Sequence, residues 1–310
     1  MLLFSILVCF SSLLQASLSS PILASKPKPV DLSYTCMAIF DARDPNFKHD
    51  NVPVILLHGL SGNKESWHGV LELIALDTKK KVCAADLRNH GQSPWNDEEY
   101  DAIAMTEDVK HLMDRINASK AVLLGHSLGG KTGVQLALTY PERVEKLIVE
   151  DMRPNGVSPE GLKQVQLAAR IFKEIEKHIP QGVTEREAKE EVFKNLKENL
   201  AKINITQEFR DLNNLPIKCL DGKCNLTLNP VLLDAVLRNI TDLLNESSGR
   251  FEGPALFIYG AASIFTVNED ESNIKKLFPD AKLVGVEGAG HTVHTSRKFM
   301  TEVIKFINGK

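Results

Sequence analysis

The chain has 310 residues, a formal net charge of −3, and hydrophobic residues at 43% of its positions. This length and apolar content suffice for one α/β domain with an insertion. The charge balance lacks the excess of Lys and Arg with which proteins hold nucleic-acid phosphates, so no nucleic-acid partner is expected. The sequence contains no internal repeats and no low-complexity tracts.

Residues 1–20 have the pattern of a secretory signal peptide. The apolar run Leu2–Phe10 is followed by Leu13-Leu14 and then by small residues, and it is too short for a stable membrane span. No Lys or Arg precedes the run, but a mitochondrial presequence would be rich in Arg, and no Arg occurs before Arg43. We therefore expect cleavage and a secreted or endomembrane-luminal protein, with a mitochondrial location as the alternative.

Two apolar segments in the first part of the chain are predicted to be buried strands. Val52–Leu57 ends in His58-Gly59, and the backbone N–H after such a strand commonly serves as an oxyanion donor. We assign this donor to Leu60. The second apolar segment, residues 81–85, opens into a polar turn. Asp86 and Arg88 in this turn are interpreted as organising the loop.

A serine lies on a predicted strand-to-helix turn. The apolar run Ala121–Leu124 leads into Gly125-His126-Ser127-Leu128-Gly129, and a helix-like stretch follows. Glycines two residues on either side of Ser127 are typical of a tight, strained turn known as a nucleophile elbow. We predict that Ser127 is the nucleophile and that the amide of Leu128, at the helix N-terminus, is the second oxyanion donor.

The catalytic acid is the difficult assignment. Its usual place is the loop after the strand Pro254–Gly260, but that loop has no carboxylate before Glu269, and Ser263 stands where an aspartate is expected. The other place follows an earlier strand that ends in Glu150-Asp151. We predict Asp151, because its turn leaves the sheet at the carboxyl edge, where catalytic groups gather. Ser263 either assists the hydrogen bond to the histidine or fills the vacated position.

A histidine near the C-terminus is the expected base. His291 lies on a glycine-rich loop after the strand-like segment Lys282–Val286, and the order nucleophile, acid, histidine is that of α/β-hydrolases. His294 is the nearest rival, but its position at a helix entry is expected to point it away from the elbow. His58 and His126 are interpreted as structural or pocket-lining.

Residues 156–253 are predicted to form a helical cap inserted between two parts of the core, 21–155 and 254–310. Helical spacing extends over Ser158–Ile179 and Thr184–Lys202, and Pro230–Leu244 indicates a third helix. Such a cap forms the acyl-binding side of an active site and excludes water. Its apolar residues are interpreted as cap core in preference to substrate contacts: Leu167, Ile171, Phe172, Ile175, Phe193 and Leu196.

Removal of Cys9 with the signal peptide would leave an even number of cysteines. Cys219 and Cys224 flank an Asp-Gly turn across which a disulfide is feasible, and zinc is disfavoured because no second pair lies nearby. Cys36 and Cys83 lie on predicted strands and are either bridged or buried thiols. Five Asn-x-Ser/Thr sequons are candidate glycosylation sites: Asn117, Asn204, Asn225, Asn239 and Asn245.

Four segments together resemble a known family: His58-Gly59-Leu60, residues 86–94, residues 125–131 and residues 290–294. They are similar to the abhydrolase domain-containing protein 11 family and its bacterial esterase relatives, over about residues 32–306. The resemblance implies an α/β-hydrolase fold, with a mostly parallel central sheet, helices on both faces and a helical cap. In bacterial members the acid likewise follows the strand after the elbow helix, with a serine at the usual acid position, which matches Asp151 and Ser263. Leu87 and Thr292 depart from the family pattern, so substrate preference does not carry over.

The resemblance implies esterase or lipase-like hydrolysis without a cofactor. We expect a serine hydrolase that cleaves a small-molecule or lipid ester, or a thioester, through an acyl-enzyme on Ser127, with no metal site and no stable membrane span. Two alternatives stay open. One is an acyltransferase, in which an alcohol or thiol replaces water. The other is a non-catalytic module that keeps the pocket for a lipid or hormone.

Overall fold

The structure is a computed structural model that describes residues 26–39, 52–201, 215–244 and 246–309. The predicted signal peptide and the sequons at Asn204 and Asn245 lie outside the described residues. None of the helices in the described ranges has the length and apolar character needed to cross a membrane.

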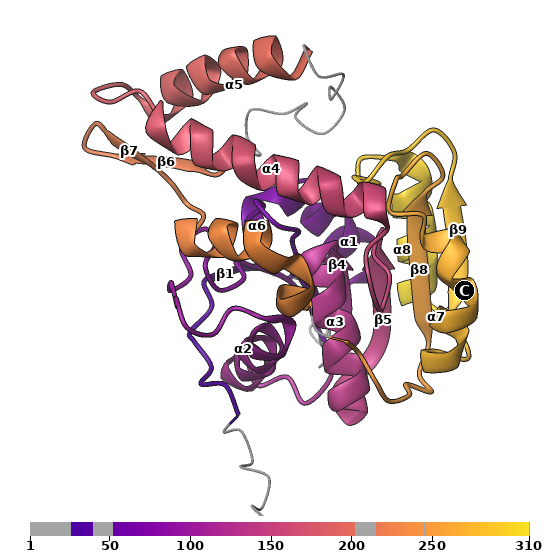
Figure 1. Ribbon diagram of the computed structural model, residues 1–310. Coiled ribbons are helices and arrows are strands. Elements are labelled where there is room, and N and C mark those ends of the chain that lie inside the picture. The colour runs from indigo at the N-terminus through magenta and orange to yellow at the C-terminus, as the bar shows by residue number, and fades with distance from the viewer. Residues whose placement is uncertain (1–25, 40–51, 202–214, 245, 310) are drawn as a thin grey trace, which may run out of the picture.

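A seven-stranded sheet runs through the centre of the molecule in the order β1-β3-β2-β4-β5-β8-β9 (Figure 1). All neighbouring strands are parallel except the edge strand β1, which pairs antiparallel with β3. The strands are β1 Tyr34–Met37, β2 Val54–Leu57, β3 Val82–Ala85, β4 Ala121–His126, β5 Val144–Glu150, β8 Ala255–Gly260 and β9 Lys282–Val286. A parallel sheet needs cover on both faces, which explains why β2 and β3 are apolar at every position.

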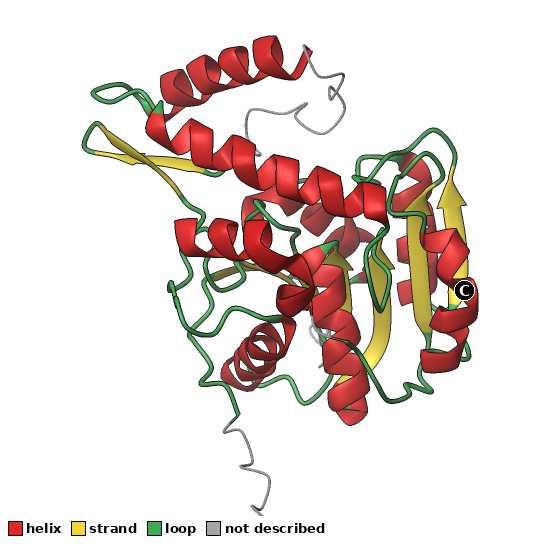
Figure 2. Ribbon diagram, viewed as in Figure 1, coloured by secondary structure: helices red, strands yellow, loops and turns green. Residues whose placement is uncertain are grey.

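Helices cover both faces of the sheet (Figure 2). Alternation along β2 sends Ile55 and Leu57 into one apolar cluster, with α2 and α3, and Val54 and Leu56 into a second, with α1 and α8. The core helices are α1 Val70–Thr78, α2 Ala102–Arg115, α3 Leu128–Thr139, α7 Glu271–Leu277 and α8 Arg297–Ile307, with 3-10 turns η1 Lys64–Trp67, η2 Pro141–Arg143 and η4 Val267–Asp270.

The chain between β5 and β8 builds a separate layer above the carboxyl ends of the strands (Figure 1). Its elements are α4 Pro159–Lys177, α5 Glu185–Ala201, the hairpin β6 Ile217–Leu220 and β7 Lys223–Leu226, and α6 Pro230–Leu244. Helix α4 starts at an N-cap, Ser158, whose side chain accepts the N–H of Gly161. The Ser158 hydroxyl also donates to the carbonyl of Ile264 at 2.5 Å, which ties the start of this layer to the loop after β8.

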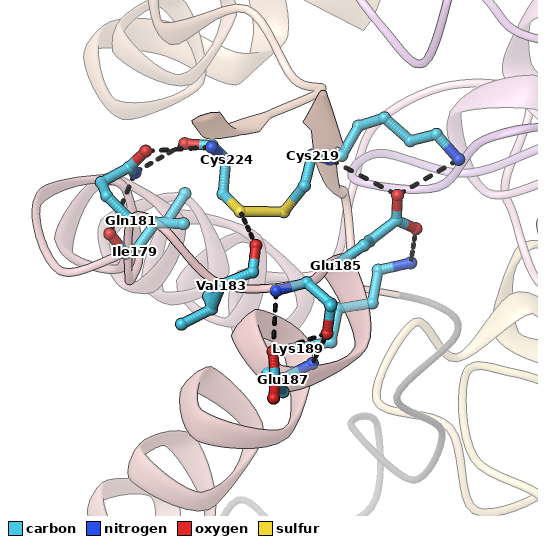
Figure 3. The surroundings of a disulfide bond; sticks show 10 residues. Ile179, Gln181, Val183, Glu185, Glu187, Lys189, Cys219 and Cys224 are labelled. Carbon is cyan, nitrogen blue, oxygen red and sulfur yellow. Dashed lines mark hydrogen bonds and ion pairs between the residues drawn. A yellow bond between two sulfur atoms is a disulfide. The ribbon is translucent and has the colours of Figure 1, made fainter. Parts of the chain in front are cut away.

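Two disulfides are present. The predicted bridge between Cys219 and Cys224 joins β6 to β7, and Gln181 pairs with the backbone of Cys224 in both directions (Figure 3). For Cys36 and Cys83 the sequence left two possibilities open, and the structure has them bridged. They are direct partners in the antiparallel pairing of β1 with β3, which brings their side chains together. Both disulfides therefore fix a strand pair.

Candidate active site

Ser127 stands between β4 and α3 in a backbone conformation that L residues rarely adopt, with φ 51° and ψ −113°. The flanking glycines explain how the turn closes. A Cβ on Gly125 would lie 2.2 Å from the carbonyl oxygen of Gly129, and a Cβ on Gly129 would lie 2.2 Å from that of Leu57. Only glycine fits either position, so the pentapeptide holds Ser127 above the strand ends.

Asp151 and His291 meet directly. Asp151 Oδ2 lies 2.7 Å from His291 Nδ1, and because a carboxylate can only accept, Nδ1 carries the proton. Asp151 follows β5 and is fully buried. Its other oxygen accepts the N–H of Gly260 at 3.1 Å. The aspartate is thus oriented by β8, the neighbouring strand, and in turn orients the imidazole.

Ser263 lies beside this pair. Its hydroxyl donates at 2.5 Å to Asp151 Oδ2, the same oxygen that faces His291. The next carboxylate along that loop, Glu269, pairs instead with Arg153, at 3.3 Å. Glu269 is therefore engaged away from His291.

Two rings hold the His291 imidazole. Phe265 stacks on it with centroids 3.9 Å apart and planes 13° apart, and the ring of His126 lies 4.6 Å away. His126 Nε2 is 3.1 Å from the carbonyl of His291 and donates to it. Burial lowers the pKa of His126 to about 3, so this side chain is neutral at physiological pH. His126 is therefore a neutral support for the loop that carries His291.

His294 is also at this site, and the expectation that it points away from the elbow is wrong. Glu150 holds it there: the carboxylate oxygens each lie 2.9 Å from His294 Nδ1. Burial opposes ionisation of Glu150, but His294, His126 and these hydrogen bonds together lower its pKa to about 2. The adjacent acids at 150–151 and the histidines three residues apart at 291 and 294 were the sequence signal for this second pair.

Ser127 and His291 border one cavity of about 140 Å³. Leu60, a predicted oxyanion donor, lies on its wall, and Leu128 begins α3, where the first amides have no intrahelical partner. Helix α4 closes the opposite side with Val165, Ala168 and Phe172. Phe172 packs in the core, as interpreted from the sequence, and its side chain also lines the cavity.

His58 also lines this cavity, whereas the loop and glycosylation candidates lie apart from it. Arg88 forms a bidentate ion pair with Asp108, and Asp86 pairs with Lys64, so these residues hold loops together. The sequons at Asn117, Asn225 and Asn239 are exposed. In the described part of the chain, no three His, Cys, Asp or Glu side chains form a group that could hold a metal ion.

Comparison with known proteins gives consistent matches. The family model described as alpha/beta hydrolase fold matches residues 52–297. The sn-1-specific diacylglycerol lipase ABHD11 of Danio rerio is 31% identical over 284 residues, covering 90% of this chain and 83% of the relative. Ethanol acetyltransferase 1 of Cyberlindnera jadinii is 28% identical over 303 residues, covering 91% of this chain and 85% of the relative. Among solved structures, a marine microorganism esterase has a TM-score of 0.69 and 27% identity, covering 89% of this chain and 99% of the esterase.

Proposed function

Because the chain belongs to the α/β-hydrolase fold family, as a carboxylic ester hydrolase related to the ABHD11 lipases, we propose that it works through an acyl-enzyme on Ser127. The observation that carries this proposal is the hydrogen bond of 2.7 Å between Asp151 and His291 at the cavity that Ser127 also borders. An imidazole oriented by a buried carboxylate beside a strained serine is the arrangement that activates a hydroxyl for acyl transfer.

The chemistry follows from where the protons are. With its Nδ1 proton donated to Asp151, His291 uses Nε2 to take the proton of Ser127 as Oγ attacks the ester carbonyl. The amides of Leu60 and Leu128 are our proposed donors to the oxyanion. The C–O bond to the leaving group breaks, and His291 returns its proton to the departing alcohol. Water then attacks the acyl-enzyme with His291 again as base, releasing the acid and restoring Ser127.

The cavity indicates which part of a substrate it can accept. Its volume of about 140 Å³ is small beside the several hundred Å³ of sites for drug-sized ligands. Val165, Ala168 and Phe172 make the cap side apolar. We propose that this side receives the acyl group of a small-molecule or lipid ester, and that short acyl chains are turned over faster than long ones. Equal turnover of an acetate and a palmitate ester would refute this preference.

An acyltransferase is the second candidate, favoured by the similarity to ethanol acetyltransferase 1. In that case an alcohol would intercept the acyl-enzyme in place of water. Hydrolysis of an aryl acetate with added ethanol distinguishes the two, because transfer yields ethyl acetate at the expense of acetate. A product that is only acetate at every ethanol concentration would exclude this candidate.

We also propose that the protein enters the secretory pathway. Disulfides persist in oxidising compartments, and the exposed sequons are open to glycosylation. Expression in eukaryotic cells tests this through the N-terminus of the mature chain and a mass decrease on treatment with an N-glycosidase. Recovery of unglycosylated protein from mitochondria would support the alternative location.

The nucleophile is tested with a fluorophosphonate probe on the purified mature protein, followed by peptide mapping. We expect the label on Ser127, no label in Ser127→Ala or His291→Ala, and a loss on the order of 10⁶-fold in turnover for Ser127→Ala. Heat-denatured wild type controls for non-specific reaction. Near-wild-type turnover in Ser127→Ala would overturn the assignment, and a folded wild type without label would favour the non-catalytic binding module.

A further inference from the structure

A second carboxylate–imidazole pair lies beside the first. Glu150 immediately precedes Asp151 at the end of β5, and His294 follows His291 by three residues. Glu150 is fully buried, and His294 borders the same cavity as Ser127. The acyl-transfer chemistry described above needs one such pair, so the second requires its own explanation.

Glu150 connects the elbow that carries Ser127 to the turn that follows His291. Its main-chain carbonyl accepts the N–H of Ser127 at 3.0 Å, because His126 and Glu150 are partners in the pairing of β4 with β5. Its side chain accepts the main-chain N–H groups of Val293 at 2.6 Å and His294 at 2.7 Å. One residue thus holds the elbow through its backbone and the turn after His291 through its carboxylate.

His294 completes this anchor. Its Nδ1 donates to Glu150, and its ring packs 4.9 Å from that of Trp67, itself buried on η1. The ring of His126 contacts both histidines, with centroids 4.6 Å from His291 and 5.6 Å from His294. A displacement of the 293–294 turn would therefore move His291 as well. A buried carboxylate is costly unless it is fully hydrogen bonded, and here that requirement is met by the turn itself.

We propose that Glu150 and His294 are positioning residues that set the placement of His291 relative to Ser127. This inference rests on the proposed function. A misplacement of about 1 Å between reacting groups can cost about a hundredfold in rate, so loss of the anchor should appear in the chemical step. Substrate binding to the apolar cap side should change little.

The principal test is Glu150→Gln, assayed with an activated ester such as p-nitrophenyl acetate. Glutamine removes the charge and replaces one acceptor oxygen with an NH₂ group. If Oε1 still accepts from the turn, this NH₂ faces the N–H of His294 Nδ1, which weakens the anchor. We expect kcat per folded molecule to fall about ten- to a hundredfold, with KM within about threefold of wild type. Asp108→Asn is the matched control. It removes the charge of another fully buried carboxylate, one paired with Arg88 away from the cavity, so it should lower the melting temperature and leave kcat unchanged.

A pair of His294 variants tests the same anchor should Glu150→Gln not fold. His294→Asn keeps an N–H that can donate to Glu150, whereas His294→Phe keeps the ring but removes the donor. We expect the Asn variant to retain severalfold more kcat than the Phe variant. Equal losses would contradict positioning through this hydrogen bond, as would wild-type kcat in all three variants. Fluorophosphonate labelling of wild type distinguishes failure of the proposed function from failure of this inference. An unlabelled wild type refutes the proposed function, whereas a labelled wild type with fully active variants refutes only this inference.

Discussion

At the scale of single residues, the proposed catalytic acid stands one strand away from its usual place in this fold. Asp151 follows β5, and the position after β8 holds Ser263, whose hydroxyl now supports the carboxylate. The strands are parallel neighbours, so both residues lie at the same sheet edge, where Asp151 meets His291 and Ser263 donates to Asp151. The sequence pointed to Asp151 because the β8 loop has no carboxylate before Glu269, and the structure brings Asp151 to His291. The sequence left the role of Ser263 open, because a hydroxyl's direction depends on tertiary neighbours.

Ser263→Ala should lower kcat/KM about ten- to a hundredfold. The substitution removes one hydrogen bond to a buried charge, worth about 1.5–3 kcal/mol, while the N–H of Gly260 and His291 still hold Asp151. Steady-state hydrolysis of an aryl ester measures the effect, and Ser263→Thr, which keeps a hydroxyl, is the control. A loss as large as that of Asp151→Asn, about 10⁴-fold by analogy with other triads, would mean that Ser263 is indispensable and not merely supportive.

At the scale of elements, the layer between β5 and β8 is fastened at both of its ends to α3. The ammonium group of Lys131 donates to the carbonyl of Pro154 at 2.5 Å and to the hydroxyl of Ser247 at 2.7 Å. Asn155 and Ser247 also exchange two hydrogen bonds, at 2.9 and 2.6 Å. Burial lowers the pKa of Lys131 to about 8, so the side chain is still mostly charged at pH 7. This lysine joins the segment that leaves β5 to the segment that approaches β8.

Lys131→Met should loosen this layer while the sheet stays folded. Methionine fills similar space but leaves the carbonyl and the hydroxyl without their donor, at a cost of about 1–3 kcal/mol. Limited proteolysis below the melting temperature should therefore cleave within residues 156–247 several times faster than in wild type. Lys163→Met, at an exposed position on α4, is the control. Unchanged cleavage rates in the Lys131 variant would show that the layer does not depend on this anchor.

Local sequence patterns predicted the helices, strands and elbow more successfully than they predicted the tertiary contacts of individual side chains. The elbow was predictable because the close approaches at Gly125 and Gly129 arise within a short stretch of chain and the strand beside it. The contacts of Lys131 and His294 were not predictable, because a lysine is ordinarily exposed and a histidine at the start of a helix ordinarily faces solvent. Their placement depends on which strands lie side by side. Glu150, for example, reaches Val293 across 143 residues of sequence.

At the scale of the whole molecule, the carboxyl edge of the sheet gathers several imidazoles, of which His58 and His90 are buried and His126 is partly buried. His58, His90 and His126 are all within the fold, and burial lowers the pKa of each, to about 3 for His90 and His126. His58 accepts the N–H of Leu87 through Nε2, and His126 supports the His291 loop. Each must stay neutral in the folded protein, whereas in the unfolded chain each titrates near pH 6.5. Acid should therefore destabilise this fold well before its carboxylates protonate.

The predicted loss can be measured. The folded-state pKa of these histidines lies below the unfolded value, so the stability that depends on their neutral form is complete above about pH 6.5 and is lost as pH falls. For His90 and His126, whose folded-state pKa is about 3, the loss between pH 7 and pH 5 is about 2 kcal/mol each. Glu150, whose pKa is lowered from 4.5, adds its loss only in more acidic solution.

Urea unfolding of wild type and His90→Phe at pH 7 and pH 5 isolates one histidine. The difference in the free energy of unfolding between the two pH values should be about 2 kcal/mol smaller in the variant than in wild type. His90 suits this test since its Nε2 has no hydrogen-bond partner within the described residues. An undiminished difference in His90→Phe would mean that His90 takes up its proton without unfolding.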